Sequence, residues 1–244
     1  MSDVSVSAPP PPPPPPPSSQ STSTFDFVQP FAFVFQDERW LSKVLIGGLF
    51  QLLAIFLIGI FFVFGYCAQL ARNVIAGVPK PLPEWDRLGD YFADGVKLFL
   101  VTLMYAIPFA LIVVAVMIPA GIFNAISERH GNDLAELASG TILSFLSCLI
   151  VPISLALSFW IPAALVYTVV EDRIGAAFEF AKIYHYIKNN FVNYLLAFVV
   201  YLVARFAVGF GFLLLCCGVF VTAFWSVIVA TYAFAQAYRM SPVK

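Results

Sequence analysis

The sequence predicts an all-α, polytopic integral membrane protein with about five transmembrane helices and two or three interfacial amphipathic helices. Its 244 residues are 61% hydrophobic, its mean hydropathy is +0.89, and only 11% of its residues are charged. Soluble domains carry roughly 25% charged residues, so this composition cannot form a water-soluble surface. Long apolar blocks without a charge recur along the chain, and about 20 apolar helical residues cross a hydrocarbon core roughly 30 Å thick.

Two segments precede the apolar blocks. Residues 1–24 are rich in Ser and Thr around nine consecutive prolines, Pro9 to Pro17. Proline cannot donate a backbone hydrogen bond and favours polyproline II, so we expect a disordered tail that acts as a stiff spacer or as a ligand for a proline-recognition module. Residues 25–43 are crowded with Phe and end in charged residues and Trp40. They are too short to span, and we expect an interfacial segment at the headgroup level.

The transmembrane domain is expected over residues 44–240. The apolar block 141–170 is longer than one membrane crossing, and Pro152 and Pro162 are expected to bend it. The last block, 191–238, must fold back once, near Gly209, Gly211 and Gly218. The predicted spans are about 44–66, 98–123, 141–170, 191–213 and 217–238.

Two polar connections are expected to form amphipathic helices at the interface. Over 84–99, the residues Trp85, Leu88 and Phe92 recur at helical spacing opposite a row of aspartates. Over 171–190, polar residues repeat at steps of three, four and seven. Each segment precedes a pair of apolar spans.

The distribution of cationic residues predicts the orientation. Nine lie in the first connection, the third connection and the tail, and three lie on the opposite side if the five spans alternate: Arg39, Lys43 and Arg129. Cationic residues concentrate in cytoplasmic loops. The amino terminus is therefore predicted outside and the carboxyl terminus in the cytoplasm; the alternative is that the first span is a re-entrant hairpin.

Candidate catalytic, cofactor and metal sites are not found in the sequence. The acidic residues of 84–94 could hold a divalent cation, but a straight helical row of acids is more often a solvated face. His130 and His185 lie in different connections, which does not suit a shared metal site. A formal net charge of −1 offers no basic field for nucleic acid. Arg205 is the one ionisable residue deep in an apolar block, so it is a functional candidate that either snorkels or faces a ligand.

One group of motifs is shared with a known family. Its members here are Trp40-x-x-Lys43, Gly47-Gly48, Gly65-Tyr66, Arg72 and the sequence Leu82-Pro83-Glu84-Trp85-Asp86. With these motifs the chain resembles, from about Phe31 to Arg239, the prokaryotic membrane proteins catalogued as domain of unknown function 4013. The resemblance implies a multi-span protein, in a prokaryotic plasma membrane, with no established activity.

From these observations we expect a non-enzymatic membrane protein that organises lipid or a partner membrane protein, or a second copy of itself, through its two interfacial helices. The alternative is a small transporter or permease component, in which prolines break the spans and Arg205 faces an anionic substrate. In the motif, Pro81 and Pro83 stop the preceding helix, and Trp85 is expected to anchor the next one at the interface.

Overall fold

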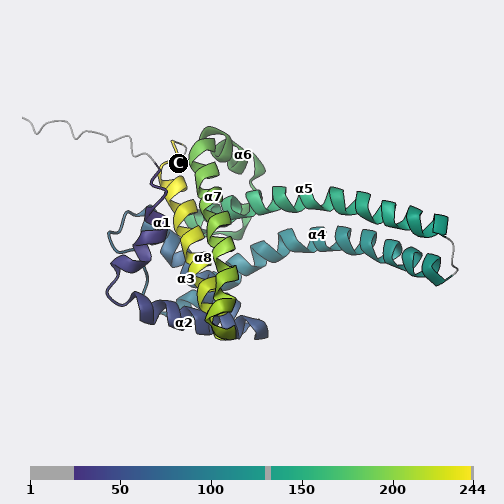
Figure 1. Ribbon diagram of the computed structural model, residues 1–244. Helices are drawn as coiled ribbons and strands as arrows, with labels where there is room; N and C mark the ends of the chain where they lie inside the picture. The colour runs from purple at the N-terminus through teal and green to yellow at the C-terminus, as the bar shows by residue number, and fades with distance from the viewer. Residues whose placement is uncertain (1–24, 130–132, 243–244) are drawn as a thin grey trace, which may run out of the picture.

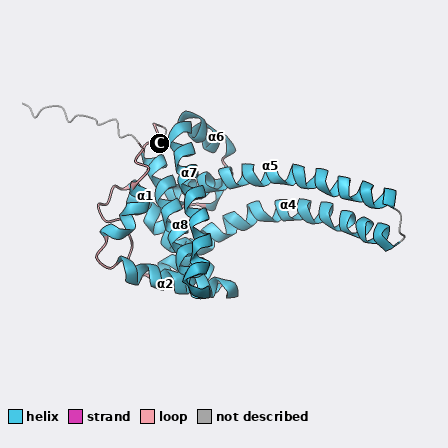
Figure 2. Cartoon of the chain, viewed as in Figure 1, coloured by secondary structure: helices cyan, strands magenta, loops and turns pink. Residues whose placement is uncertain are grey.

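The structure is a computed structural model that describes residues 25–129 and 133–242. The predicted proline-rich tail and His130 lie outside the described residues. Within the described ranges, every regular element is a helix (Figure 2), which confirms the all-α fold class. The elements are α1 (Gln29–Ala32), η1 (Phe33–Gln36), α2 (Trp40–Leu53), η2 (Ala54–Phe56), α3 (Ile58–Ile75), α4 (Leu88–Arg129), α5 (Asp133–Glu171), η3 (Ile174–Phe178), α6 (Phe180–Asn189), α7 (Phe191–Val208), η4 (Gly209–Leu214) and α8 (Leu215–Arg239).

Five helical segments are long and apolar enough to cross a membrane, as the sequence predicts. They are Ile58–Ile75, Leu88–Phe123, Ile150–Glu171, Phe191–Gly211 and Gly218–Arg239. The fold-back near Gly209 and Gly211 is also found, because the six residues of η4 connect α7 to α8.

The first span differs from the prediction. The apolar block 44–66 is not one helix, because the chain breaks at Leu57, whose φ of 64° lies in the left-handed region. Residues before the break belong to α2 and η2, and the spanning helix is α3 instead. Immediately after the break, Gly59 packs against the Phe50 carbonyl group, where a Cβ atom would not fit. Hydropathy gives the length of an apolar run and does not show such a reversal within it.

Helices α4 and α5 run side by side and project well beyond the other helices (Figure 1). At 1.5 Å per residue, the 42 residues of α4 extend about 63 Å. Each of the two helices contains two prolines, and the predicted Pro152 and Pro162 both lie within α5. The remaining helices pack around the base of this pair.

The packing at the base depends on glycine. Gly65 of α3 faces the backbone of Tyr91 in α4, and Gly95 of α4 faces the backbone of Phe61 in α3. The contact is therefore reciprocal, because each helix contributes a glycine and also the backbone that the other glycine faces. On each helix these two positions are four residues apart. A side chain at either glycine would collide with a carbonyl oxygen of the other helix. Small residues allow this close approach of two helix backbones.

Of the two predicted interfacial helices, the structure contains the second as a separate helix and not the first. The segment 84–99 is not a separate helix, because α4 begins at Leu88 and continues without interruption into the second span. Its residues from Leu88 onward pack along α3. The segment 171–190 does contain a short separate helix, α6, which buries Ile183, Tyr186 and Ile187 and leaves His185 exposed.

Candidate functional site

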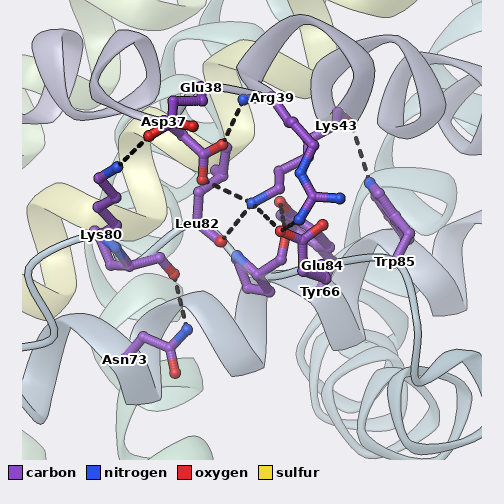
Figure 3. Close-up of polar contacts among 12 residues, drawn as sticks. Asp37, Glu38, Arg39, Lys43, Tyr66, Asn73, Lys80, Leu82, Glu84 and Trp85 are labelled. Atoms are coloured by element: carbon purple, nitrogen blue, oxygen red, sulfur yellow. Dashed lines mark hydrogen bonds and ion pairs between the residues drawn. The ribbon is translucent and has the colours of Figure 1, made fainter.

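The connection between α3 and α4 is held along its backbone by side chains from the surrounding helices (Figure 3). The prolines of this connection prevent it from forming a helix, so its carbonyl groups need other partners. Four successive carbonyl groups each accept one side-chain hydrogen bond. The donors are Asn73 Nδ2 to Pro81 (2.8 Å), Lys43 Nζ to Leu82 (3.1 Å), Tyr66 OH to Pro83 (2.9 Å) and Tyr91 OH to Glu84. The motif is thus fixed in one conformation by α2, α3 and α4.

Lys43 is the buried charge of this site. Only 5% of its side chain is exposed. Its ammonium group lies 2.7 Å from Asp37 Oδ2 and 2.9 Å from Glu84 Oε1, and it also donates to the Leu82 carbonyl group (Figure 3). The ammonium group donates hydrogen bonds to Asp37 and to the Leu82 carbonyl group, and it forms an ion pair with Glu84. Arg39 adds a second cation 2.9 Å from Glu84, but its side chain is largely exposed, so that pair contributes little.

Trp85 lies in the turn before α4 and not on the helix. Its ring stacks on Tyr66, with centroids 4.3 Å apart, and on Phe50, with centroids 4.8 Å apart. Its indole N–H donates to the Lys43 carbonyl oxygen at 3.0 Å. The expectation that Trp85 shares a helical face with Leu88 is therefore wrong, because the turn at Trp85 directs its ring between α2 and α3.

Replacing Trp85 with phenylalanine should keep most of the ring contact and remove the indole hydrogen bond. We expect this change to lower the free energy of unfolding by about 1 kcal/mol more than the same change at Trp225. Trp225 is the matched control because its indole nitrogen has no hydrogen-bond partner. Unfolding by SDS titration in mixed micelles measures both. Equal losses in the two variants would show that the bond to the Lys43 carbonyl group does not stabilise the fold.

A known family model matches most of the chain, including much of this site. The family model described as Protein of unknown function (DUF4013) matches residues 48–217, which is more than half of the chain. The chain belongs to this family. No curated protein and no solved structure matches it. The match to the DUF4013 model includes Gly65, Tyr66, Arg72 and residues 82–86, but it begins after Lys43.

The DUF4013 site also corrects the predicted position of Arg39 and Lys43. Both residues contact Glu84 in the first connection, so they lie at the same end of the bundle as that connection and not opposite it. We name this end the motif face; α3 ends there, α4 begins there, and α5 ends there. Asn190 Nδ2 donates to the Ala237 carbonyl oxygen at 2.7 Å, which brings the start of α7 to the end of α8. The prediction was wrong because it counted the block 44–66 as one complete crossing.

Arg72 belongs to a second cluster of charges. It pairs with Asp94 on α4 and lies 3.4 Å from Asp172, which follows α5. Lys97 lies 2.8 Å from the same Asp172 and 3.5 Å from Asp94. Two cations thus alternate with two anions and connect α3, α4 and α5. A cavity of about 620 Å³ lies beside this cluster, and Arg72 and Asp94 are among its lining residues.

Arg205 is far from the motif in the chain and belongs to another part of the bundle. It is exposed near the end of α7, and it lines an apolar cavity between helices. The structure therefore brings Tyr66 together with residues 82–85 and leaves Arg72 and Arg205 in separate places. No hydrogen bond of the described network reaches the exposed side chain of Asp86.

Asp37 provides a pH test of the buried charges, because its pKa lies below the ordinary value of 3.8. Burial is the largest single influence and raises the pKa. The hydrogen bonds from Lys43 and the Arg39 backbone, with the charge of Lys43, outweigh it. Because the pKa of Asp37 is lower in the folded protein than in the unfolded chain, the Asp37 carboxylate stabilises the fold above about pH 3.8. This contribution is lost as the pH falls through the pKa of Asp37 in the folded protein. Between about pH 5 and pH 3, wild-type protein should lose more stability than Asp37→Asn. Parallel pH profiles of the two would contradict this assignment.

Sequence reasoning missed three members of the site: Asp37, Asn73 and Tyr91. Their donors and acceptors serve backbone groups and charges that are distant in the sequence, and periodicity does not report such contacts. The polar atoms of the site hold one another and the motif backbone. Among the described residues, no group of three His, Cys, Asp or Glu side chains is placed to hold a metal ion.

Proposed function

We propose that this DUF4013 protein is a non-enzymatic integral membrane protein that binds a transmembrane helix of a partner protein through the projecting part of α4 and α5. We name residues 102–129 and 133–162 the arm. The arm replaces the two interfacial helices as the proposed binding element, since the first of those helices is part of α4 itself.

The observation that carries this proposal is the exposure of the arm. Among the residues whose burial the structure describes, Val101 is the last buried one along α4, and the next is Ala163 of α5. Between them, large apolar side chains are exposed, including Leu111 at 64% and Leu155 at 56%. Exposed apolar surface of this extent favours contact with lipid or with another membrane protein.

Two features favour a protein partner over lipid alone. At 1.5 Å per residue, the part of α4 in the arm, residues 102–129, extends about 42 Å. This is longer than a membrane core of roughly 30 Å, so the arm tilts or protrudes from the core. Gly121 and Gly140 leave open space beside the arm. Small residues at such positions let a second helix approach closely. The hydroxyl groups of Ser144 and Ser154 are bonded to their own helix and leave that surface apolar.

We also propose that the motif face is cytoplasmic. Arg39 and Lys43 now join the cations of the first and third connections and of the α8 terminus at that face. Among the described cations, Arg129 alone lies at the far end of the arm, where α4 ends. Cationic residues mark the cytoplasmic side. On this proposal the beginning of the described chain and its end share the cytoplasmic side of a prokaryotic plasma membrane.

Photo-crosslinking in native membranes tests the arm. A photoreactive amino acid at Leu111 or at Leu155 should give a protein adduct of one defined mass. Val203 of α7, which is 46% exposed, is the matched control outside the arm and should give no such adduct. An adduct of twice the chain mass identifies a second copy as the partner. Lipid adducts alone at the two arm positions, or the same protein adduct at Val203, would overturn the proposal.

A transporter or permease component is the second candidate, and one observation favours it: Arg205 lines a cavity within the bundle. A cation at such a place suits an anionic substrate. A flux assay in liposomes with wild type and Arg205→Gln tests this candidate. Flux that depends on Arg205 supports transport, and no flux of anionic solutes in the wild type removes it.

A further inference from the structure

The apolar cavity beside Arg205 is a feature of the bundle that the proposed binding through the arm does not use. It has a volume of about 160 Å³ and lies among α3, α4, α5, α7 and α8. Most of its lining is aliphatic or aromatic, as with Phe64, Leu98 and Phe234. An engineered cavity of roughly this size in another protein binds benzene-sized molecules. The cavity therefore has room for a segment of an apolar chain.

Two polar groups of the lining have no partner. Ser226 is fully buried, and its Oγ makes no hydrogen bond. A buried hydroxyl group without a hydrogen-bond partner destabilises the fold. Thr231 lines the same cavity and shows the contrast, because its hydroxyl group donates to the Val227 carbonyl oxygen at 2.8 Å. Ser226 thus leaves one hydroxyl group of the lining unpaired, although its Oγ has no surface open to the cavity.

Arg205 is the second group. No hydrogen bond or ion pair joins its guanidinium group to any residue that the structure describes, although it lies in a membrane-spanning segment. Leu202, Val203 and Phe206 around it are exposed and apolar. A cation inside the membrane needs a counter-charge or access to water. Because Arg205 is both exposed and part of the lining, the cavity reaches the surface of the bundle beside a cation.

From these contacts we propose that the cavity binds an anionic amphiphile. Its apolar chain enters the space between Phe64 and Phe234, and its carboxylate or phosphate group pairs with Arg205. A free fatty acid and an acidic phospholipid share this chemistry. The proposal does not depend on the exposed surface of the arm, since the arm shares only Pro162, at its base, with the lining of the cavity.

Native mass spectrometry of the full chain, released from a neutral detergent, tests the proposal. The probes are oleate, phosphatidylglycerol and, as the uncharged control, phosphatidylcholine. Wild-type protein should retain oleate or phosphatidylglycerol in preference to phosphatidylcholine, and the two anionic probes distinguish a fatty acid from a phospholipid. Arg205→Gln should weaken that retention about tenfold. Lys188→Gln, which removes an exposed cation outside the cavity, should leave it unchanged.

A second variant tests the cavity itself. Ala230 lines it and is nearly buried, so Ala230→Leu should fill the space and abolish retention of the anionic probe. If that variant fails to accumulate, the exposed Arg205 decides the question alone, because its replacement does not disturb the core. Equal retention of all three lipids by the wild type, or equal retention of the anionic probes by wild type and Arg205→Gln, would overturn the proposal.

Discussion

Replacing Gly65 with alanine should lower the free energy of unfolding by about 3 kcal/mol, at the upper end of the cost of overpacking. The new Cβ atom would collide with the Tyr91 carbonyl oxygen. A backbone atom cannot move aside as a flexible side chain can, so α3 and α4 must separate. Separation would also weaken the reciprocal contact of Gly95 with Phe61. SDS titration in mixed micelles measures the loss.

Gly89→Ala is the matched control for Gly65→Ala. Gly89 lies in the first turn of α4, and nothing lies within 4 Å of the place where its Cβ atom would be. Alanine is about 0.5–1 kcal/mol more favourable than glycine within a helix, so this variant should be neutral or slightly more stable. A small loss in Gly65→Ala, comparable to the change in Gly89→Ala, would show that the two helices tolerate a larger spacing.

Replacing Lys43 with methionine should cost about 3 kcal/mol or more, because it leaves the buried carboxylate of Asp37 without its cation. Asp37 is only 12% exposed and would lose its closest partner, and the Leu82 carbonyl oxygen would lose its donor. The motif connection should become more accessible as a result. Hydrogen exchange at residues 81–86, together with SDS titration, measures both effects.

Two comparisons distinguish the effect of removing the buried charge of Lys43 from the effect of removing any positive charge. Lys80→Met removes a cation whose partner, Glu38, is highly exposed, and should cost less than about 0.5 kcal/mol. Adding Asp37→Asn and Glu84→Gln to Lys43→Met should restore part of the stability, because the uncompensated anions are then gone. If Lys43→Met and Lys80→Met lower the free energy of unfolding by the same amount, the three contacts of Lys43 do not stabilise the fold more than an exposed ion pair does.

Much of the fold could be predicted from the sequence, because span length and apolar composition are local properties. The spans in α7 and α8 were found within a few residues, since Gly209 and Gly211 mark the fold-back between them. The break at Leu57 could not be predicted in this way. A leucine in the left-handed region gives no signal in a hydropathy profile, and the error then placed Lys43 on the wrong side.

The sequence predicted which residues belong to the candidate site, but it did not predict how their side chains are arranged. Residues 82–86 were recognised as a motif, and Tyr66 was included with them. Helical spacing suggested that Trp85 continued the face of Leu88, but the turn before α4 directs its ring between Phe50 and Tyr66. Donors to backbone carbonyl groups, such as Asn73, depend on tertiary contacts and have no local pattern.

The claim that the beginning of the described chain and the motif share one face, with the tip of the arm opposite, is tested most directly by labelling single cysteines. The four native cysteines would be replaced by serine, and one cysteine placed at Glu38, Lys80 or Glu128. A membrane-impermeant maleimide should label the cysteines at positions 38 and 80 only in inside-out vesicles, and the cysteine at position 128 only in right-side-out vesicles. Labelling of positions 38 and 80 from opposite sides would contradict the account.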